Sequence, residues 1–322
     1  MGWTPPDYAV DDDGKVIGAQ CHRHPHNWGR WGPLDERGTA NFITPALVAS
    51  AAASIRSGRT VSCAIPLDRE GPVFPGRPGV FHSFRITGGD YVTGAPNVQK
   101  LGCFHGTDDV LFMPLQGSTQ WDGLAHVGTH HTLYNGFWIG TVDAGGARRC
   151  GIQHLAAGLQ GRGVLLDLAA DGRLEPGHAI TAADLDRSIA TQGVQVGTGD
   201  MLVIRTGHVP WWYELTDRSR YWDGAPGLAL DTAEWLHARE VAAVAMDNIA
   251  IEVQPFPPGA EHPFPLHGRL IRDLGLSLGE IWWLEDLVAA CHQEGRWDFF
   301  LSASPLRIAN AAGSPVNPIA IF

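Results

Sequence analysis

Short apolar runs that alternate with capped helical stretches are the feature that most constrains how this chain folds. Three runs are almost entirely apolar and have the length of strands buried on both faces: residues 163–168, 201–206 and 241–246. Between the first two runs, Thr181 is placed to cap a helix over residues 182–191, which Gly193 would end. This alternation predicts an α/β protein with a mixed β core.

The remaining segments fit the same class. Thr44 and Pro45 supply a cap and a first helical residue for an Ala-rich helix that Gly58 would stop. Further elements are expected as strands at 60–67, 80–86 and 299–308, a short buried strand at 110–113 and a helix at 284–292. Because no Pro/Gly/Ser-rich linker divides the chain, we expect an extended N-terminal arm over residues 1–26 and a single domain over residues 27–322.

Charge and cysteine usage limit the partners and the compartment. The 322 residues include 34 acidic and 23 basic side chains, and the formal net charge of -11 argues against nucleic acid as a partner. No apolar run approaches the roughly 20 residues that span a bilayer, and the first residues do not resemble a signal peptide. Five scattered cysteines without a Cys-x-x-Cys pair favour reduced thiols. We therefore expect a cytoplasmic protein without membrane contact.

Residues 116–136 concentrate side chains that can bind a metal. Four such side chains fall within ten positions: Asp122, His126, His130 and His131. Two carboxamides, Gln116 and Gln120, precede them, and an extended backbone at 120–122 would place Gln120 and Asp122 on one face. Carboxylate oxygens and neutral imidazole nitrogens are ligands that divalent transition metals select. The cluster predicts an active-site loop with a metal.

The same segment resembles the metal-binding motif of the cyclase family, the metal-dependent hydrolases that include kynurenine formamidase, isatin hydrolase and trans-dienelactone hydrolase. The motif of that family is His-x-Gly-Thr-His-x-Asp-x-Pro-x-His. Residues 116–126 have the same length, and Thr119, Asp122 and His126 coincide with it. The Gln-Trp-Asp sequence at its centre resembles a longer branch of the family, nearer the dienelactone hydrolases.

The match departs from the family motif at two histidines. Gln116 and Gln120 stand at those positions, and a Leu replaces the Pro. Carboxamide oxygen is a weaker, harder ligand than imidazole, so the identity of the metal is open. A second register exists, because residues 126–130 match the first half of the motif literally. That register puts Thr132 at the Asp position and Gly136 at the final His, so we favour the first.

The resemblance implies a second part of the metal site. His267, in Pro-Leu-His-Gly-Arg, and Glu285, at the start of the expected last helix, are similar to the family's later His and Glu. With Gln116, Gln120 and Asp122 they would form the ligand set of a divalent ion, Zn or Mn. His267 could instead be an ordinary loop histidine. Glu285 also has a second interpretation, because an acidic side chain is favourable in the first turn of any helix.

Other residues are candidates for catalysis and substrate binding. His126, with an ordinary pKa of about 6.5, is expected to move a proton between water and the leaving group. Candidate substrate contacts lie in the cluster or in the Asn-Trp-Gly-Arg-Trp stretch near the start of the chain: Trp28, Arg30, Trp31, Trp121 and His130. Packing and turn formation are the alternative roles of the early stretch.

The resemblance implies a swivelling β/β/α fold and a homo-oligomer. It implies a metal-dependent hydrolase that uses metal-activated water on a small-molecule substrate: an amide, lactam, lactone or ester. Two alternatives remain. One is a metal-dependent lyase or cyclase, in which the ion polarises a carbonyl. The other is a non-catalytic ligand-binding relative, which the two Gln at histidine positions of the motif favour.

Overall fold

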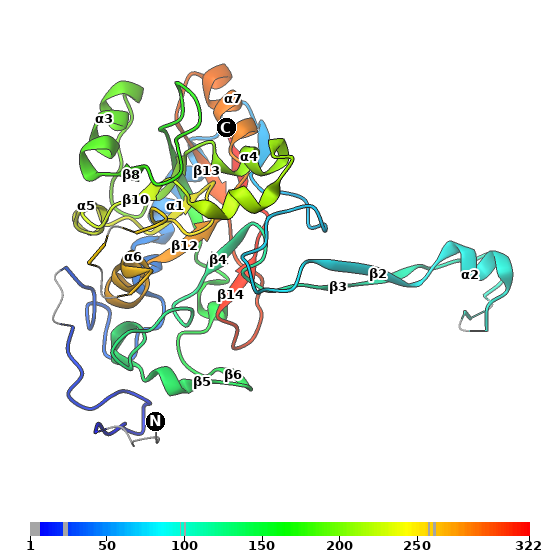
Figure 1. Cartoon of the computed structure of the whole chain (residues 1–322), viewed down its shortest axis with the longest axis horizontal. Helices are drawn as coiled ribbons and strands as arrows, with labels where there is room; N and C mark the ends of the chain where they lie inside the picture. The colour runs from blue at the N-terminus through cyan, green and yellow to red at the C-terminus, as the bar shows by residue number, and fades with distance from the viewer. Residues whose placement is uncertain (1–6, 22–24, 97, 100, 257, 260–261) are drawn as a thin grey trace.

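A mixed sheet runs through the centre of the protein (Figure 1). The structure is a computed structural model that describes residues 7–21, 25–96, 98–99, 101–256, 258–259 and 262–322. Within these residues the sheet has nine strands, in the spatial order β1 (Thr60–Ser62), β15 (Ile319–Ile321), β13 (Asp298–Ser302), β7 (Gln160–Asp167), β9 (Met201–Arg205), β11 (Ala243–Met246), β12 (Ser277–Glu280), β4 (Gln120–Asp122) and β14 (Gly313–Pro315).

The middle of the sheet is parallel. β7 pairs with β9, β9 with β11, and β11 with β12, while β13 and β4 flank this block as antiparallel neighbours. The three apolar runs of the sequence form β7, β9 and β11, whose central residues are buried. The predicted α/β class with a mixed β core is thus confirmed. The strands expected at 60–67 and 299–308 are shorter, at Thr60–Ser62 and Asp298–Ser302.

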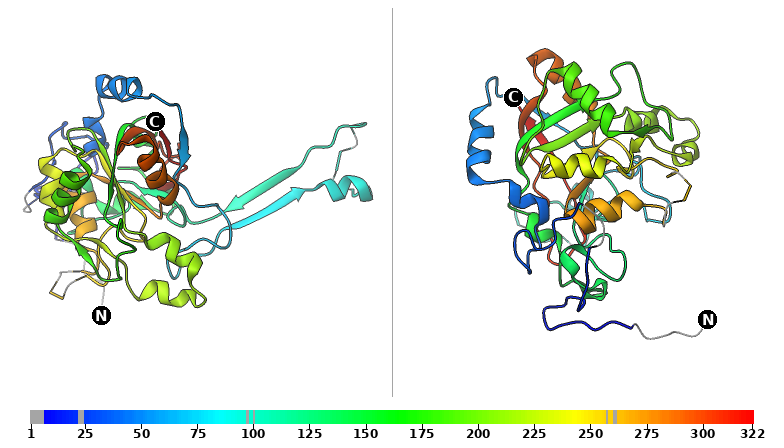
Figure 2. Two further views of the ribbon diagram at one scale, coloured as in Figure 1. Left: turned by 90° about the horizontal axis from the view of Figure 1, so that it is seen from above. Right: turned by 90° about the vertical axis from the view of Figure 1, so that its left-hand side faces the viewer.

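Helices cover both faces of the sheet (Figure 2). On one face, Leu185 of α3 (Ala182–Gln192) packs in the same cluster as Val164 of β7. On the other face, Leu287 of α7 (Glu285–Glu294) packs in the cluster that contains Leu165. Successive residues of β7 therefore enter different cores, as expected for a strand buried on both sides.

The helix caps follow the sequence. The Thr181 hydroxyl of α3 accepts a hydrogen bond from the Asp184 backbone N–H, and the Asp184 carboxylate accepts one from the Thr181 N–H. The Thr44 hydroxyl caps α1 (Pro45–Ala53) by accepting a hydrogen bond from the Leu47 backbone N–H at 3.3 Å. The other helical segments are η1 (Gly38–Phe42), η2 (Tyr134–Gly136), η3 (Ile139–Thr141), η4 (Ile152–Leu155), α4 (His208–Glu214), η5 (Arg218–Asp223), α5 (Thr232–Ala238), α6 (Pro265–His267) and η6 (Gly268–Leu274).

A long hairpin leaves the body of the protein and extends into solvent (Figures 1 and 2). It contains β2 (Phe81–Ile86), α2 (Gly88–Thr93) and β3 (Asp108–Phe112), and residues 81–112 are called the projecting hairpin below. The expectation of a buried strand at 110–113 is wrong, because every residue of β3 is exposed. The ribbon turns away from the body, so its apolar side chains meet no core.

Smaller elements complete the fold: β5 (Val142–Asp143), β6 (Gly146–Ala147), β8 (Ala179–Ile180) and β10 (Gly227–Leu228). Part of the expected N-terminal arm, at 1–6 and 22–24, lies outside the described residues. Residues 10–16 form a turn, and the backbone of Lys15 pairs with that of Phe137 in an isolated antiparallel β-bridge. Among the helices of the described ranges, none combines the length and the apolar character that crossing a bilayer requires.

Candidate metal centre

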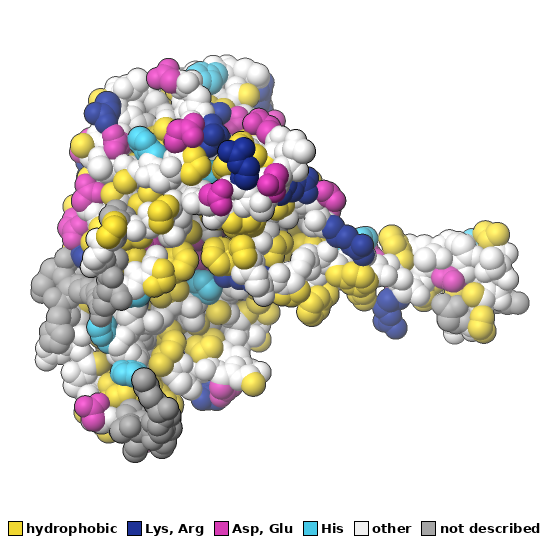
Figure 3. All heavy atoms as spheres, in the orientation of Figure 1, with side chains coloured by type: hydrophobic (Ala, Val, Ile, Leu, Met, Phe, Trp, Pro, Cys, Tyr) yellow, Lys and Arg dark blue, Asp and Glu magenta, His cyan; other side chains and the backbone are white. Residues whose placement is uncertain are grey.

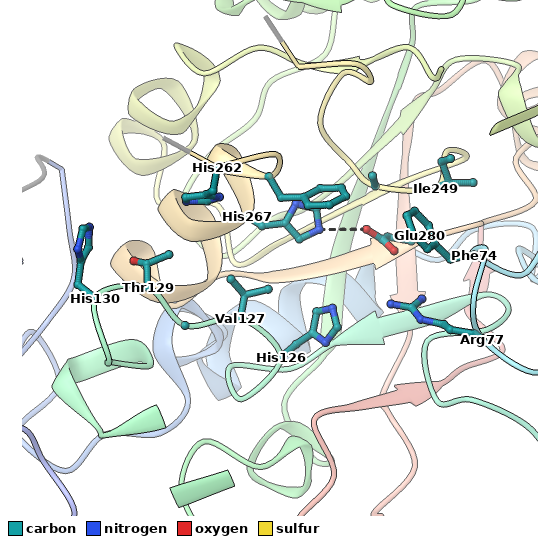
Figure 4. Close-up of a pocket in the computed structure, with 13 residues that line it drawn as sticks. Phe74, Arg77, His126, Val127, Thr129, His130, Ile249, His262, His267 and Glu280 are labelled. Carbon is teal, nitrogen blue, oxygen red and sulfur yellow. Dashed lines mark ion pairs between the residues drawn. The ribbon is translucent and has the colours of Figure 1, made fainter. Parts of the chain in front are cut away.

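Three buried side chains from separate elements meet at one point. Asp122 of β4, His267 of α6 and Glu280 of β12 each offer one ligand atom, and these atoms lie within 4.8 Å of one another. His267 Nε2 is 3.4 Å from Glu280 Oε1 (Figure 4). Asp122 and His267 lie almost half of the chain apart in sequence and were expected to bind the same ion. The structure brings them together.

Strand register determines the direction in which the side chains of β4 point. β4 pairs with β12 in antiparallel orientation, and Gln120 stands directly opposite Glu280. The Gln120 amide donates to Glu280 Oε2 at 2.8 Å and lies 3.5 Å from Asp122 Oδ1, so Gln120 and Asp122 share one face as predicted. The residue between them, Trp121, must point to the opposite face. It is fully buried there against the Trp282 ring.

Glu252 fixes the orientation of His267. Its carboxylate contacts His267 Nδ1 and accepts hydrogen bonds from the backbone N–H groups of Leu266 (3.1 Å) and His267 (3.0 Å). Glu252 thereby caps α6 and leaves Nε2 of His267 facing Glu280. A carboxylate behind a ligating imidazole is a common arrangement in metal sites, because it sets the tautomer and the ring orientation. The sequence did not indicate this role for Glu252.

The unpartnered atoms of this group fit a divalent cation. Within the described part of the chain, three buried oxygens lack a hydrogen bond, Gln120 Oε1, Asp122 Oδ2 and Glu280 Oε1, although imidazole nitrogens lie 3.7 Å from Asp122 Oδ2 and 3.4 Å from Glu280 Oε1. Buried acceptors of this kind are costly unless a cation or a donor compensates them. One imidazole nitrogen with carboxylate and carboxamide oxygens is also a donor set that suits Zn or Mn. The residues present therefore fit such an ion.

Burial shifts the protonation of the same group. Burial raises the pKa of Asp122 to about 6, although the neighbouring His126 opposes the shift. Burial also lowers the pKa of His267, but its contacts with Glu252 and Glu280 outweigh this effect and raise that pKa to about 10. The group thus holds a positive charge on His267 between carboxylates. A cation would compete with that proton for the same position.

His126 lies between the buried group and an open cavity. Its Nε2 is 3.7 Å from Asp122 Oδ2, and burial lowers the pKa of His126 below its ordinary value. The imidazole is therefore neutral near neutral pH and can accept a proton. Figure 4 shows His126 and Arg77 pointing into the same space beside His267 and Glu280. This is the arrangement that a proton-transferring histidine requires.

The cavity has a volume of about 520 Å³, which suits a small molecule. Its wall combines aromatic, basic and imidazole side chains, chiefly Phe74, Arg77, His126, His130, His262 and Phe264, with His267 and Glu280 at one side. His130, expected to contact substrate, lies in this wall and has a left-handed backbone (φ 49°). Residues 126–130, which match the first half of the motif in the second register, thus line the cavity. Asp122, which matches the motif in the first register, belongs to the buried group.

The structure places Glu285 elsewhere, and this corrects the expected ligand set. Both carboxylate oxygens of Glu285 accept hydrogen bonds from Arg205, each at 2.9 Å. Glu285 opens α7, so it takes the helix-terminus role that was its second interpretation. Glu280, five residues earlier in β12, occupies the position beside Asp122 and His267. A signal was available, because Glu280 is the only charge in the apolar stretch 276–284.

Other expected substrate contacts also lie apart from the cavity wall. Trp28 donates to the Arg272 backbone oxygen at 2.7 Å and stacks under its guanidinium. Arg30 pairs with Glu240 and lies over the Trp31 ring, and Trp121 is in the core. These side chains hold the fold together, so their aromatic and basic character serves packing.

The carboxamide of Gln116 is packed beside β14 rather than hydrogen-bonded to the buried carboxylates. Its nitrogen lies 2.5 Å from where a Cβ on Gly313 would be, and the Trp121 backbone oxygen lies 2.8 Å from the same point, so a side chain at this position would collide with the backbone of β4. The Gln116 backbone oxygen accepts a hydrogen bond of 2.6 Å from Arg77. Gly313 pairs directly with Asp122 across β14 and β4, so Gln116 lies next to the strand that carries Asp122.

The chain is similar to known proteins in sequence and in fold. Residues 60–253 match the model of a family described as "Putative cyclase". The crystal structure of a protein described as a novel cyclase is 45% identical and superimposes with a TM-score of 0.86, covering 92% of this chain and 99% of that one. Isatin hydrolase of Roseibium aggregatum is 26% identical over 204 residues, 61% of this chain and 71% of its own length. Isatin hydrolase A from Ralstonia solanacearum shares the fold, with 20% identity, a TM-score of 0.60 and coverage of 86% of this chain and 96% of that chain.

Proposed function

The chain belongs to the cyclase family, and on that premise we propose that it is a metal-dependent hydrolase of a small amide, lactam, lactone or ester. The observation that carries the proposal is the buried Asp122, His267 and Glu280 group beside a cavity of about 520 Å³. Acceptor oxygens of this group make no hydrogen bond within the described residues, which suits a bound cation in place of the proton on His267. A divalent ion, Zn or Mn, would supply Lewis-acid activation of water and of the substrate carbonyl when bound there.

His126 is the proton-transferring residue in this proposal. It is neutral because burial lowers its pKa, and its ring faces both Asp122 and the cavity. The imidazole accepts a proton from the attacking water and then donates it to the leaving nitrogen or oxygen. Asp122 holds the protonated imidazole through their 3.7 Å contact, so the charge that develops on His126 is offset.

Arg77 is the substrate-orienting residue in this proposal and replaces Arg30 in that role. Its guanidinium lines the cavity, donates to the Gln116 backbone oxygen and stacks on Phe74 at 5.4 Å. No carboxylate among the described residues lies within ion-pair distance of Arg77. A cationic fork of this kind in a cavity binds an anionic group, so the preferred substrates carry a carboxylate.

The partner in this proposal is a small molecule, and the scattered cysteines without a Cys-x-x-Cys pair favour a cytoplasmic enzyme. A lyase or cyclase remains the second candidate, since the same residues could polarise a carbonyl without adding water. Solvent labelled with oxygen-18 separates the two, because only hydrolysis transfers the label into the product.

The test of the hydrolase is made on chelated and metal-refilled protein. Activity on a panel of lactones, anilides and aryl esters is expected to vanish with chelation and to return with Zn or Mn. His126→Asn should lower kcat by about a hundredfold to ten-thousandfold while the ion still binds. Activity that is indifferent to both treatments would exclude the metal, and full activity in His126→Asn would exclude the proton-transfer role.

A further inference from the structure

The cavity extends to both sides of the candidate metal centre. In Figure 4, His267 lies in the middle, with Arg77 on one side and a group of polar side chains on the other. This second group, called the histidine side below, consists of Thr129, His130 and His262. In the space-filling view several histidine side chains reach the surface of the body (Figure 3). Because Arg77 can contact only one end of a substrate, the histidine side faces the other end.

A tight turn carries His130 to the cavity wall. Thr129 and Thr132 exchange two backbone hydrogen bonds, each of 3.0 Å. Between them, His130 and His131 both have a left-handed backbone, with φ of 49° and 63°. Two such residues in a two-residue turn are characteristic of a type I′ turn, for which Asn and Gly are the preferred residues. The turn itself therefore does not favour histidine, and the imidazole of His130 serves another purpose.

Arg272 holds this turn from behind. Its buried guanidinium donates to the Thr132 hydroxyl from Nε at 3.0 Å and from Nη2 at 2.7 Å, and it stacks over the Trp28 ring at 4.4 Å. On the outer side, the His131 ring packs on Tyr8 with 4.8 Å between ring centroids. A backbone conformation that its residues disfavour persists only where the surroundings hold it, and such positions cluster at ligand sites. These contacts fix the tip of the turn at the cavity wall.

His262 adds a second imidazole to the histidine side. It lines the cavity, and its Nε2 is buried and makes no hydrogen bond with the described residues. A Cβ on Gly268 would lie 3.5 Å from that nitrogen and 3.2 Å from the methyl group of Thr129, so glycine keeps the space beside both groups open. Gly268 directly follows His267, which places this space next to the metal centre. A buried nitrogen without a partner favours a ligand that supplies one.

We propose that the substrate has polar groups on both sides of the bond that is broken: a carboxylate at Arg77 and an oxygen acceptor that His130 and His262 recognise. The inference rests on the proposed hydrolase and adds the second half of its substrate class. A hydroxyl, a carbonyl and a carboxylate can all accept a hydrogen bond from an imidazole N–H. An apolar group on the histidine side is disfavoured, because it would leave the buried nitrogen of His262 without a partner.

The test measures the binding of unreactive ketone analogues, in which a methylene replaces the ester oxygen. All analogues carry the carboxylate for Arg77, and they differ at the opposite end, which is a methyl, a hydroxyl or a carboxylate group. Calorimetry on the metal-loaded wild type should give a Kd for the better polar analogue that is about threefold to tenfold below that of the methyl analogue. Whether the hydroxyl or the carboxylate binds more tightly shows if the recognised oxygen is neutral or anionic.

Four variants assign the preference for a polar end to its residues. His130→Asn should lose most of it, because Asn suits the turn but its carboxamide is shorter than the imidazole. His262→Phe keeps a ring but no nitrogen and should lose it as well. Two controls should keep it: His131→Asn, in the same turn but outside the cavity wall, and His82→Asn, in β2 of the projecting hairpin. Circular dichroism verifies the fold of each variant.

The outcomes separate this inference from the hydrolase itself. Equal Kd values for the methyl and the polar analogues in the wild type would overturn the inference, and so would an unchanged preference in both His130→Asn and His262→Phe. Equal losses in His130→Asn and His131→Asn would also overturn it, because the shape of the turn rather than the imidazole would then matter. A failure of the proposed function looks different, since no analogue would bind more tightly to metal-loaded than to chelated protein.

Discussion

The carboxylate of Glu252 contacts Nδ1 of His267, and the opposite ring nitrogen faces Glu280 at 3.4 Å. This contact explains why His267, the last residue of the short helix α6, has one fixed orientation. Glu252 is fully buried and also accepts two backbone N–H groups, so its carboxylate has little freedom to move. His267 therefore presents one nitrogen to the buried carboxylates whether or not a ligand is bound.

Replacing Glu252 should weaken metal binding without removing a ligand. Glu252→Gln keeps the shape but loses the charge behind His267, so we expect the affinity for Zn or Mn to fall about tenfold to a hundredfold. Competition with a chromogenic chelator measures this affinity, and circular dichroism verifies the fold. An affinity equal to that of the wild type would mean that Glu252 only caps α6.

The two candidate glutamates of the last third of the chain should behave differently. Glu280→Gln removes a carboxylate from the buried group, and we expect the rise in unfolding temperature on adding Zn or Mn to disappear. Glu285→Gln breaks the pair with Arg205 but should leave that rise intact. Thermal unfolding with and without the ion compares them. The opposite pattern would restore Glu285 as the ligand.

Arg77 should determine preference for anionic substrates. Arg77→Met removes the only guanidinium of the cavity wall in the described residues, so KM for an ester with a carboxylate should rise about tenfold to a hundredfold. KM for the matching carboxamide ester should change little, and Arg77→Lys should restore part of the difference. Equal losses on both esters would show that Arg77 serves only to hold Gln116.

His208 should make the protein sensitive to acid. The ring is buried and stacks on Tyr221 at 4.4 Å, and neither of its nitrogens has a hydrogen-bond partner among the residues that the structure describes. Burial lowers the pKa of His208 to about 3. Between this value and the ordinary pKa, the imidazole is protonated in the unfolded chain and neutral in the folded chain. The stability that results is complete above the ordinary pKa of about 6.5 and is lost as the pH falls toward 3.

His208→Phe should remove this sensitivity and keep the aromatic packing. Between pH of about 6.5 and about 5, the wild type should lose about 2 kcal/mol more of its free energy of unfolding than the variant. Urea unfolding at the two pH values measures the difference. The contributions of other titrating groups to the pH dependence are the same in both proteins and cancel. Parallel losses would mean that His208 is protonated in the folded state.

The sequence predicts those parts of the fold that depend on local patterns. Thr181 and Gly193 bound α3 because capping and the left-handed turn are properties of a few adjacent residues. Gln120 and Asp122 share a face because strand alternation is equally local. The same alternation could have excluded Trp121 from the substrate list, since it lies between them.

The remaining site residues depend on pairing between distant strands. Glu280 rather than Glu285 reaches Asp122 because β12 pairs with β4, and no local pattern of either strand specifies that register. Composition did carry a weaker signal. Glu252 and Glu280 are single charges inside apolar stretches, 249–253 and 276–284, and a buried charge must have a partner. Arg77 lies in an irregular segment, so nothing but the assembled cavity identifies it.

The position of β4 has a consequence for biosynthesis. Gln120–Asp122 is held between β12, at Ser277–Glu280, and β14, at Gly313–Pro315, so β4 has no partner strand in the large sheet until both of these later segments have been synthesised. Contacts between residues this far apart in sequence form late in folding. A fragment that ends before β12 would therefore lack the Asp122, His267 and Glu280 group, because Glu280 lies in β12.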